Sequence, residues 1–339
     1  NIHDMSKPRA AIYKNTFSEK EGSVPLRPFA LIRRPVPMHV PARRRIPRPS
    51  QPSVASKPIS CNITFQQEVI MYKLIAIDID GTLLNDKHEV TPEVCEAIEE
   101  AKKRGVKIVL CTGRAITGVR KYIKKLGLNG EDDFVAAFNG GIVQRTANEE
   151  TVVKIPMKFA DIQKIYQLSR ELGVSMNVFN ESKMYTLNKE INKYTVLDAY
   201  LLEIDFAYRT IEELTDDAEF LKVVFVEEPD LLSRAIDAIP REFWENYNMV
   251  KSAPFYFEFL HPDANKGTAL RRIAEKLGIK REEVMAIGDS GNDLSMIQYA
   301  GLGVAMEHAM DILKKHADYI TLSNNEAGVA HAIRKFILK

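Results

Sequence analysis

The chain has 339 residues, a length that allows two domains and additional tails. Hydrophobic residues make up 45% of the chain and charged residues 27%, which are ordinary values for a globular protein with a substantial core. No apolar run reaches the roughly 18 residues that a membrane-spanning helix requires, so we expect no membrane span. The three cysteines are odd in number and lack CxxC spacing, which argues against a disulfide framework and favours the reducing cytoplasm.

The net charge of +1 conceals an asymmetry along the chain. Residues 1–70 carry a net charge of +8 and ten of the sixteen prolines, whereas the remainder carries −7. Because proline removes backbone donors and blocks helices, this stretch without periodicity is predicted to be a disordered tail. The acidic remainder argues against an enzyme of nucleic acids, since phosphate backbones are held mainly by Lys and Arg. Two alternatives for the tail are a segment that binds nucleic acid or membrane and an Arg-rich transit peptide.

Another interpretation of the tail is that it is translated upstream DNA. The chain begins with Asn1, and structured sequence begins abruptly at Met71. The four residues 67–70 can be encoded by codons that contain a bacterial ribosome-binding sequence at plausible spacing before Met71. We prefer this interpretation to a native tail.

From Met71 onward, short apolar runs alternate with amphipathic segments. The first helix has Thr91 as its N-cap, proline at its first position and Gly105 after its end. Such alternation predicts an α/β fold with right-handed βαβ units, in which a Rossmann-like parallel sheet is covered on both faces. We predict strands over 74–77, 106–111, 135–138, 284–287, 301–305 and 319–322, and helices over 92–104, 115–126, 266–277, 294–300, 310–316 and 326–338.

The middle of the chain is less regular. It mixes helix-like segments near 160–172 and 229–238 with a strand-like run at 221–226. We interpret it as an α+β cap domain inserted between the third strand and the helix that begins at 266. The predicted domains are a catalytic core formed by 71–157 and 258–339 and a cap domain formed by 158–257.

Polar clusters follow the predicted strands at the points where they end. In an open parallel sheet, ligands bind outside the carboxyl ends of the strands, so we expect the topology to bring the clusters together. They are Asp78-Ile79-Asp80-Gly81-Thr82, Thr112-Gly113-Arg114, Asn139-Gly140-Gly141 and Gly288-Asp289-Ser290-Gly291-Asn292-Asp293, and Asn265-Lys266-Gly267 joins them at a helix start.

Three carboxylates in these clusters indicate a metal-dependent reaction. Asp78, Asp80 and Asp289 would repel one another at one point, and a hard divalent cation with oxygen ligands resolves that repulsion. Mg²⁺ characteristically takes one or two carboxylates, waters and a substrate phosphate. A carboxylate neutralised in this way can attack phosphorus, and Asp78 is the candidate nucleophile because it leaves the strand directly. Asp80 would then protonate the leaving alkoxide and later deprotonate water.

Other side chains of the clusters suit the transferring phosphoryl group. Thr112 offers a hydroxyl, Gly113 an unobstructed amide and Lys266 a positive charge. Asn292 can also donate a hydrogen bond to phosphate. Asp293 is expected to orient its neighbours from behind the metal ligands.

Each motif alone has a commoner explanation, such as a turn, a helix cap or a solvated lysine. Their chain order makes the combination specific, and competing chemistries lack their parts. Cys111 has no arginine six positions later, so a cysteine-phosphatase loop is absent. The sequence also has no GxSxG, no Walker loop, no GxGxxG after the first strand and no zinc-ligand spacing of histidines.

In this order, DIDGT, CTGR, NKG and GDSGND resemble the four motifs of the haloacid-dehalogenase-like (HAD) hydrolases. The insertion resembles the C2-type cap of their Cof-type branch, and residues 71–339 are similar to the YidA-like sugar phosphatases of that branch. The resemblance implies Asp78, Asp80 (through its main-chain oxygen) and Asp289 as metal ligands. It also implies that the substrate phosphate contacts the Ile79 amide, Thr112, Gly113, Lys266 and Asn292. The tail has no counterpart in the family.

The expected function is Mg²⁺-dependent hydrolysis of small phosphorylated metabolites, chiefly sugar phosphates, in the cytoplasm, with neither nucleic acid nor membrane as a partner. One alternative is a phosphomutase on the same core; another is a regulatory or nucleic-acid-binding protein that acts through the basic tail. Cap residues are expected to grip the leaving group, with Lys189, Tyr194 and Lys222 as weak candidates. The particular substrate and the oligomeric state cannot be read from the sequence.

Overall fold

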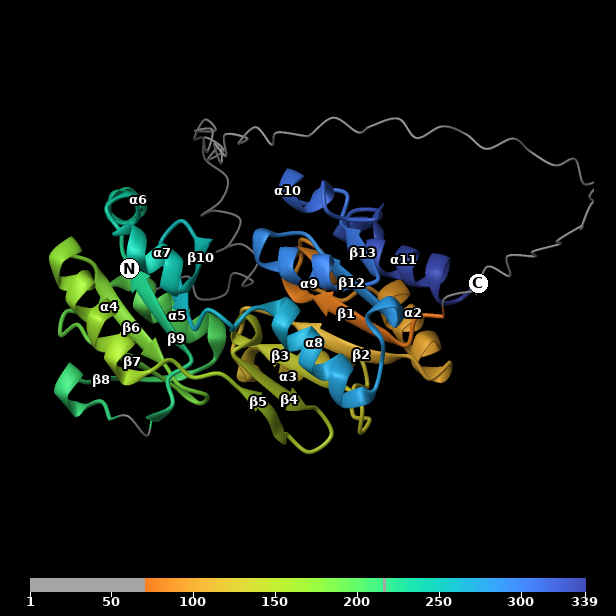
Figure 1. Ribbon diagram of the computed structural model, residues 1–339, viewed down its shortest axis with the longest axis horizontal. Helices are drawn as coiled ribbons and strands as arrows, with labels where there is room; N and C mark the ends of the chain where they lie inside the picture. Colours follow the sequence, from red (N-terminus) through yellow and green to blue (C-terminus); the bar gives the residue numbers. More distant parts are fainter. Residues whose placement is uncertain (1–70, 216–217) are drawn as a thin grey trace, which may run out of the picture. The chain divides into compact units, whose positions relative to one another are not determined.

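Two β-sheets organise the residues that this computed structural model describes, 71–215 and 218–339 (Figure 1). The larger sheet has eight strands in the order β14-β13-β12-β1-β2-β3-β4-β5, and the smaller has six in the order β10-β11-β9-β6-β7-β8. The expectations for the basic tail, residues 1–70, lie outside the described residues.

The larger sheet contains six mutually parallel strands, as the alternation of strands and helices predicts. They are β1 (Leu74–Asp78), β2 (Lys107–Cys111), β3 (Phe134–Ala137), β12 (Val284–Gly288), β13 (Leu302–Ala305) and β14 (Tyr319–Ile320). Two further strands, β4 (Ile142–Arg145) and β5 (Thr151–Lys154), were not predicted. They extend the sheet in antiparallel fashion, because the short turn after β3 reverses the chain and leaves no room for a crossover helix.

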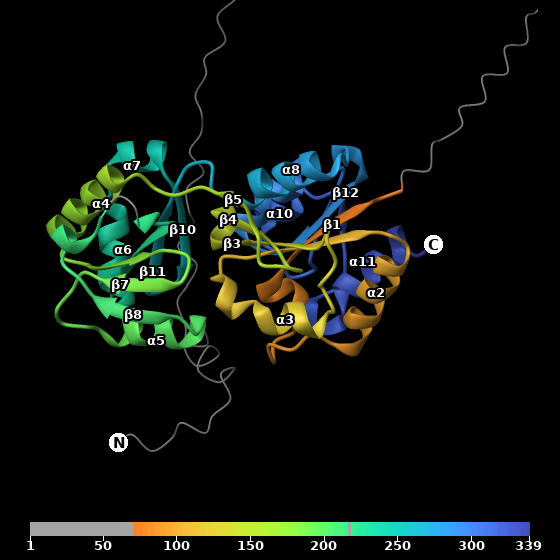
Figure 2. The same cartoon turned by 90° about the horizontal axis from the view of Figure 1, so that it is seen from below.

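Helices cover both faces of this sheet, with α8 on one side and α2, α3 and α11 on the other (Figure 2). The predicted helix over 115–126 is divided into a 3-10 turn at Ile116–Gly118 and the short α3, and Thr117 Oγ1 of the turn donates to the carbonyl of Leu202. The helices are α2 (Pro92–Lys103), α3 (Arg120–Lys125), α8 (Lys266–Leu277), α9 (Leu294–Tyr299), α10 (Asp311–Lys314) and α11 (Gly328–Phe336). The Rossmann-like α/β class is therefore confirmed.

The smaller sheet and its helices lie between β5 and α8 in the chain. Its last strand reaches Leu260, so the expected boundary at 257 falls inside a strand. The strands are β6 (Ser175–Phe179), β7 (Lys183–Thr186), β8 (Asp205–Tyr208), β9 (Lys222–Val226), β10 (Asn248–Ala253) and β11 (Tyr256–Leu260). The helices are α4 (Phe159–Leu172), α5 (Lys193–Leu202), α6 (Pro229–Asp237) and α7 (Arg241–Asn246).

The two faces of the smaller sheet belong to different hydrophobic cores, because side chains alternate along each strand. Val223 and Phe225 of β9 pack in a separate cluster with residues of α4, α6 and α7. Val224 and Val226 of the same strand instead join the main core, which the larger sheet supplies. Val224 and Val226 therefore lie on the face of the smaller sheet that is directed at the larger one. Residues that pair with them on neighbouring strands lie on the same face.

Candidate active site

The polar clusters meet at the carboxyl edge of the larger sheet. Asp78 is the last residue of β1, Thr112 directly follows β2 and Asp289 directly follows β12. Because β1 lies between β2 and β12, the three residues come from adjacent strands that run in the same direction. The sheet therefore places them at one edge, as the topology predicts.

A buried lysine joins two of the carboxylates. Lys266 Nζ lies 2.5 Å from Asp78 Oδ1 and 2.6 Å from Asp293 Oδ1, and the lysine side chain is fully buried. Burial raises the pKa of Asp78 well above its usual value and Asp293 raises it further, while Lys266 opposes both effects. Burial lowers the pKa of Lys266, but Asp293 and Asp78 outweigh it and keep that pKa above its usual range. The lysine therefore remains charged between the two carboxylates.

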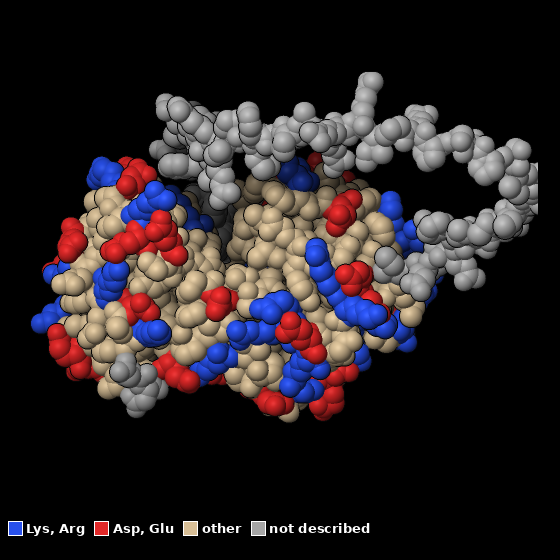
Figure 3. All heavy atoms as spheres, in the orientation of Figure 1, with Lys and Arg blue, Asp and Glu red and all other residues tan. Residues whose placement is uncertain are grey.

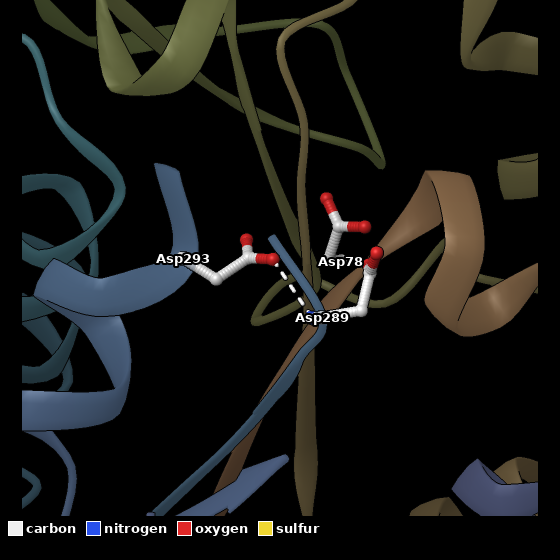
Figure 4. A group of neighbouring side chains, drawn as sticks. All are labelled: Asp78, Asp289 and Asp293. Atoms are coloured by element: carbon white, nitrogen blue, oxygen red, sulfur yellow. Dashed lines mark hydrogen bonds between the residues drawn. The ribbon is translucent and has the colours of Figure 1, made fainter. Parts of the chain in front are cut away.

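Asp78, Asp289 and Asp293 form a compact acidic group, with one carboxylate oxygen of each within 4.8 Å of the others (Figure 4). Asp293 Oδ2 accepts hydrogen bonds from the amides of Asp289 and Ser290 at 3.0 and 2.9 Å. Because its other oxygen is bonded to Lys266, Asp293 suits the orienting role better than that of a metal ligand. Asp289 is held by the hydroxyls of Thr82, at 2.8 Å, and Ser290, at 2.9 Å.

This donor set fits a hard divalent cation. Burial raises the pKa of Asp289, and Asp293 raises it further. The cluster thus concentrates negative charge that a cation would relieve, with the oxygen ligands that Mg²⁺ and Ca²⁺ prefer. Asp78, Asp289 and Asp293 each offer one carboxylate oxygen that could bind such a cation.

Two glycines allow the polar loops to approach one another. Gly81 has φ +82°, and a Cβ at this position would lie 2.6 Å from Asp289 Oδ2. Gly140 has φ +90°, and its Cβ would lie 2.5 Å from the carbonyl oxygen of Asn265, the N-cap of α8. Any side chain here would separate the clusters, so both loops depend on glycine.

Asp80 forms an ion pair with Arg114. Its carboxylate accepts from Arg114 Nε at 2.7 Å and from Arg114 Nη2 at 2.5 Å. Partial burial raises the pKa of Asp80, but the bidentate Arg114 outweighs burial and lowers it. The ion pair with Arg114 therefore favours the ionised form of Asp80.

Two of the expected phosphate ligands, Ile79 and Thr112, directly follow strands β1 and β2. Thr112 is buried, and its hydroxyl accepts from the amide of Arg114 at 3.1 Å, which leaves its proton for another acceptor. Ile79 directly follows Asp78 in the loop after β1. Asn292 Nδ2 donates to Asn139 Oδ1 at 3.0 Å.

Asn139 belongs to one of the predicted polar clusters, but sequence reasoning gave it no role of its own. It is buried and has φ +52°, a left-handed conformation that asparagine tolerates better than most residues. Its side-chain amide lies 3.3 Å from the position of a Cβ on Gly113. The Asn-Gly-Gly motif indicates a turn, and nothing in the sequence pairs it with Asn292.

The three cap candidates lie in different environments. Lys189 is exposed. The hydroxyl of Tyr194 donates to Glu228 at 2.9 Å, and its ring stacks on Phe255. Lys222 is buried and pairs with Glu258 at 3.2 Å.

Cys111 is unsuited to nucleophilic catalysis, as its motif predicts. Burial raises the pKa of its thiol to about 12, so the reactive thiolate is scarce at neutral pH.

The fold and the site have counterparts among known proteins. Residues 75–333 match the haloacid dehalogenase-like hydrolases. The chain is 50% identical over 268 residues to the protein YxeH of Bacillus subtilis (strain 168), covering 79% of this chain and 99% of that protein. It is 34% identical over 277 residues to the 5-amino-6-(5-phospho-D-ribitylamino)uracil phosphatase YcsE of the same organism, covering 81% of this chain and 100% of that protein. The crystal structure of a haloacid dehalogenase-like hydrolase from Bacteroides thetaiotaomicron is 31% identical, with a TM-score of 0.69 and coverage of 78% of this chain and 99% of that one.

The chain therefore belongs to the haloacid dehalogenase-like hydrolases, in their Cof-type branch. It is a phosphatase of that family, and its aspartate cluster is suited to metal binding.

Both signs of charge occur on the surface of the described residues. On the face that Figure 3 shows, acidic and basic side chains are interspersed, without a continuous basic tract among the described residues there. Within 71–215 and 218–339, every helix is too short or too polar to cross a bilayer.

Proposed function

We propose that this protein is a Mg²⁺-dependent phosphatase of sugar phosphates and related metabolites, acting through an aspartyl-phosphate on Asp78. The observation that carries the proposal is the buried Lys266, which holds Asp78 at 2.5 Å beside the acidic group at the sheet edge. The name of the relative YcsE supports the substrate class, because it specifies a phosphate ester on a ribityl chain.

Each residue has a proposed role before the chemistry begins. Asp78 and Asp289, with the main-chain oxygen of Asp80, would hold Mg²⁺, which when bound offsets the repulsion between these carboxylates and the substrate phosphate. Lys266 favours the ionised form of Asp78 and orients its carboxylate. Phosphoryl oxygens would accept hydrogen bonds from the residues proposed for phosphate: the amides of Ile79 and Gly113, the Thr112 hydroxyl, the Lys266 ammonium and the Asn292 amide.

The first step transfers the phosphoryl group to the enzyme. An oxygen of Asp78 attacks phosphorus, the bond from phosphorus to the ester oxygen breaks, and Asp80 gives its proton to the departing alkoxide. The alcohol leaves and Asp78 carries an acyl phosphate. Asp80, now a carboxylate, then takes a proton from a water molecule as that water attacks phosphorus. The bond to Asp78 breaks, which releases inorganic phosphate and restores both aspartates.

We also propose how the chain is divided into a catalytic core and a cap domain. Residues 71–157 and 258–339 would form the catalytic core and 158–257 the cap, with the boundary near Leu260 adjusted to the end of β11. The cytoplasm would supply both the substrates and the Mg²⁺.

The test combines a substrate panel with an inactive variant. Wild-type protein with Mg²⁺ should release inorganic phosphate from sugar monophosphates, and release rather than internal transfer distinguishes a phosphatase from a mutase. After acid quench, a peptide that contains Asp78 should carry a phosphoryl group in the mass spectrum. Asp78→Asn is nearly isosteric but cannot attack phosphorus, so it should fold normally and lose turnover. Hydrolysis at the wild-type rate by a well-folded Asp78→Asn protein would overturn the mechanism.

A further inference from the structure

Asn139 lies in the turn after β3, and its side chain reaches two of the residues proposed for phosphate. The residue is buried, and its backbone amide donates to the carbonyl of Thr112 at 2.8 Å, which ties the turn to the end of β2. Its side-chain amide lies 3.3 Å from the position of a Cβ on Gly113 and accepts a hydrogen bond from Asn292 Nδ2 at 3.0 Å. Buried polar groups are normally bonded, so the partners of this amide fix its orientation.

A carboxylate of the cap sheet determines which end of the Asn139 amide faces Asn292. Asn139 Nδ2 donates to Glu258 Oε2 at 3.5 Å, which is a long hydrogen bond to a buried acceptor. The other oxygen of Glu258 accepts from Lys222 Nζ at 3.2 Å and from Ser252 Oγ at 2.8 Å. Because a carboxylate paired with a lysine only accepts hydrogen bonds, the Nδ2 end of Asn139 is directed at Glu258 and the Oδ1 end at Asn292.

The same polarity continues into Asn292. Since Asn139 offers it an oxygen, Asn292 turns its NH₂ group toward Asn139 and uses one hydrogen there. The second hydrogen remains for another acceptor, which is the bond that the proposed phosphate contact requires. Asn292 is only half-buried, and both amides line a cavity of about 360 Å³, so a ligand can reach the group. Without Asn139, the Asn292 amide could rotate and present its oxygen, which an anionic phosphate would repel.

The turn alone does not account for the partners of Asn139. Its φ of +52° is left-handed, and glycine would serve that conformation without a side chain. The side chain instead bonds to residues 119 and 153 positions further along the chain, in β11 and in the loop after β12. It therefore joins a carboxylate of the cap sheet to a residue of the catalytic edge.

We propose that Asn139 is a positioning residue for phosphate binding: it orients the Asn292 amide so that an N–H group faces the phosphate, and Glu258 fixes the polarity of the pair. The inference rests on the proposed phosphatase function. It assigns Asn139 no contact with the reacting atoms, so Asn139 acts only through Asn292.

Substitutions in the full chain with Mg²⁺ test this inference. Asn139→Gly removes the side chain and suits the left-handed backbone. Glu258→Gln keeps the size of the side chain; because Lys222 needs its oxygen, the new NH₂ group would meet Nδ2 of Asn139 and force that amide to turn. Asn292→Ala removes the positioned amide, alone and combined with Asn139→Gly. Asn177→Ala is the matched control, because it deletes another buried asparagine, whose bond is to Thr195.

The measured quantities are kcat and KM for p-nitrophenyl phosphate and the inhibition constant of inorganic phosphate. Asn139→Gly should weaken inhibition by phosphate about tenfold, because a donor to a charged ligand loses its orientation. KM should rise by a similar factor while kcat stays within about twofold, since the phosphoryl oxygens are held in ground and transition states alike. Glu258→Gln should act in the same direction, and Asn177→Ala should leave the inhibition constant unchanged.

The double variant is decisive, because it separates a positioning role from a structural one. Added to Asn292→Ala, Asn139→Gly should have no further effect on the inhibition constant, since the residue through which it acts is gone. If Asn139→Gly weakens phosphate by the same factor with and without Asn292, Asn139 has only a structural role and the inference is refuted. An effect of Asn139→Gly without one of Glu258→Gln would overturn the polarity assigned to Glu258.

Two further results distinguish the inference from the function on which it rests. If wild-type protein hydrolyses p-nitrophenyl phosphate but Asn139→Gly binds phosphate as wild type does, the proposed function stands and the positioning role is refuted. If wild-type protein with Mg²⁺ neither hydrolyses p-nitrophenyl phosphate nor binds inorganic phosphate in calorimetry, the proposed function is wrong and the positioning role with it.

Discussion

Replacement of Asp198 by asparagine should stabilise the protein, and more so at pH 8 than at pH 5. Asp198 is buried, and its pKa in the folded protein is about 7, against an ordinary value of 3.8. The main cause is burial, which disfavours the charged carboxylate, with Glu258 adding to it. Asparagine has nearly the shape of the protonated acid and carries no charge at any pH.

The direction of this pH dependence follows from whether the folded or the unfolded state binds the proton of Asp198 more tightly. A carboxyl whose pKa is raised on folding contributes its full stability below its unfolded pKa, near 3.8, and this contribution is lost as pH rises through the folded value near 7. One unit of pKa corresponds to 1.36 kcal/mol, so the raised pKa of Asp198 costs about 4 kcal/mol of folding free energy at pH 8 and about 2 kcal/mol at pH 5. The gain from Asp198→Asn should therefore be larger at pH 8 by about 2 kcal/mol.

Urea unfolding at the two pH values measures this difference. The free energy of unfolding is extrapolated to water for wild type, for Asp198→Asn and for the exposed control Asp205→Asn, which should follow wild type at both pH values. If Asp198 instead stabilises the cap through its charge, Asp198→Asn will be less stable than wild type at pH 8. That result would refute the reasoning, because it would mean that the buried carboxylate is compensated.

Further predictions concern the catalytic core. Lys266→Met removes the cation shared by Asp78 and Asp293 and should lower the free energy of unfolding at pH 7 by about 3–5 kcal/mol, measured in urea; an unchanged value would contradict the buried ion pairs. Arg114→Met releases Asp80, whose pKa should rise, so the alkaline limb of the pH profile of kcat/KM should move to higher pH; an unmoved limb would show that Asp80 is not the proton donor. Treatment with a chelator should abolish phosphate release, and Mg²⁺ should restore it; full activity in the chelator would exclude a metal requirement.

The sequence by itself determined the fold class and most of the catalytic edge. Apolar runs followed by polar clusters identify strand ends in any parallel sheet, so Asp78, Thr112 and Asp289 could be assigned to one edge before the strand order was known. Glycine and proline at helix boundaries also located α2 and α8 within a residue. These inferences succeed because they depend on local chemistry and on a topology that few alternatives satisfy.

Only the tertiary structure decided which polar groups meet. The pairs Arg114 with Asp80 and Asn139 with Asn292 join residues from different clusters, and spacing along the chain gives no measure of their separation in space. The cap shows the same limit: Lys222 is two residues before Val224 in sequence, yet its partner Glu258 is supplied by β11, a strand 36 residues further along the chain. Strand order and register determine such pairings, and both follow from the packing of whole sheets rather than from any single segment.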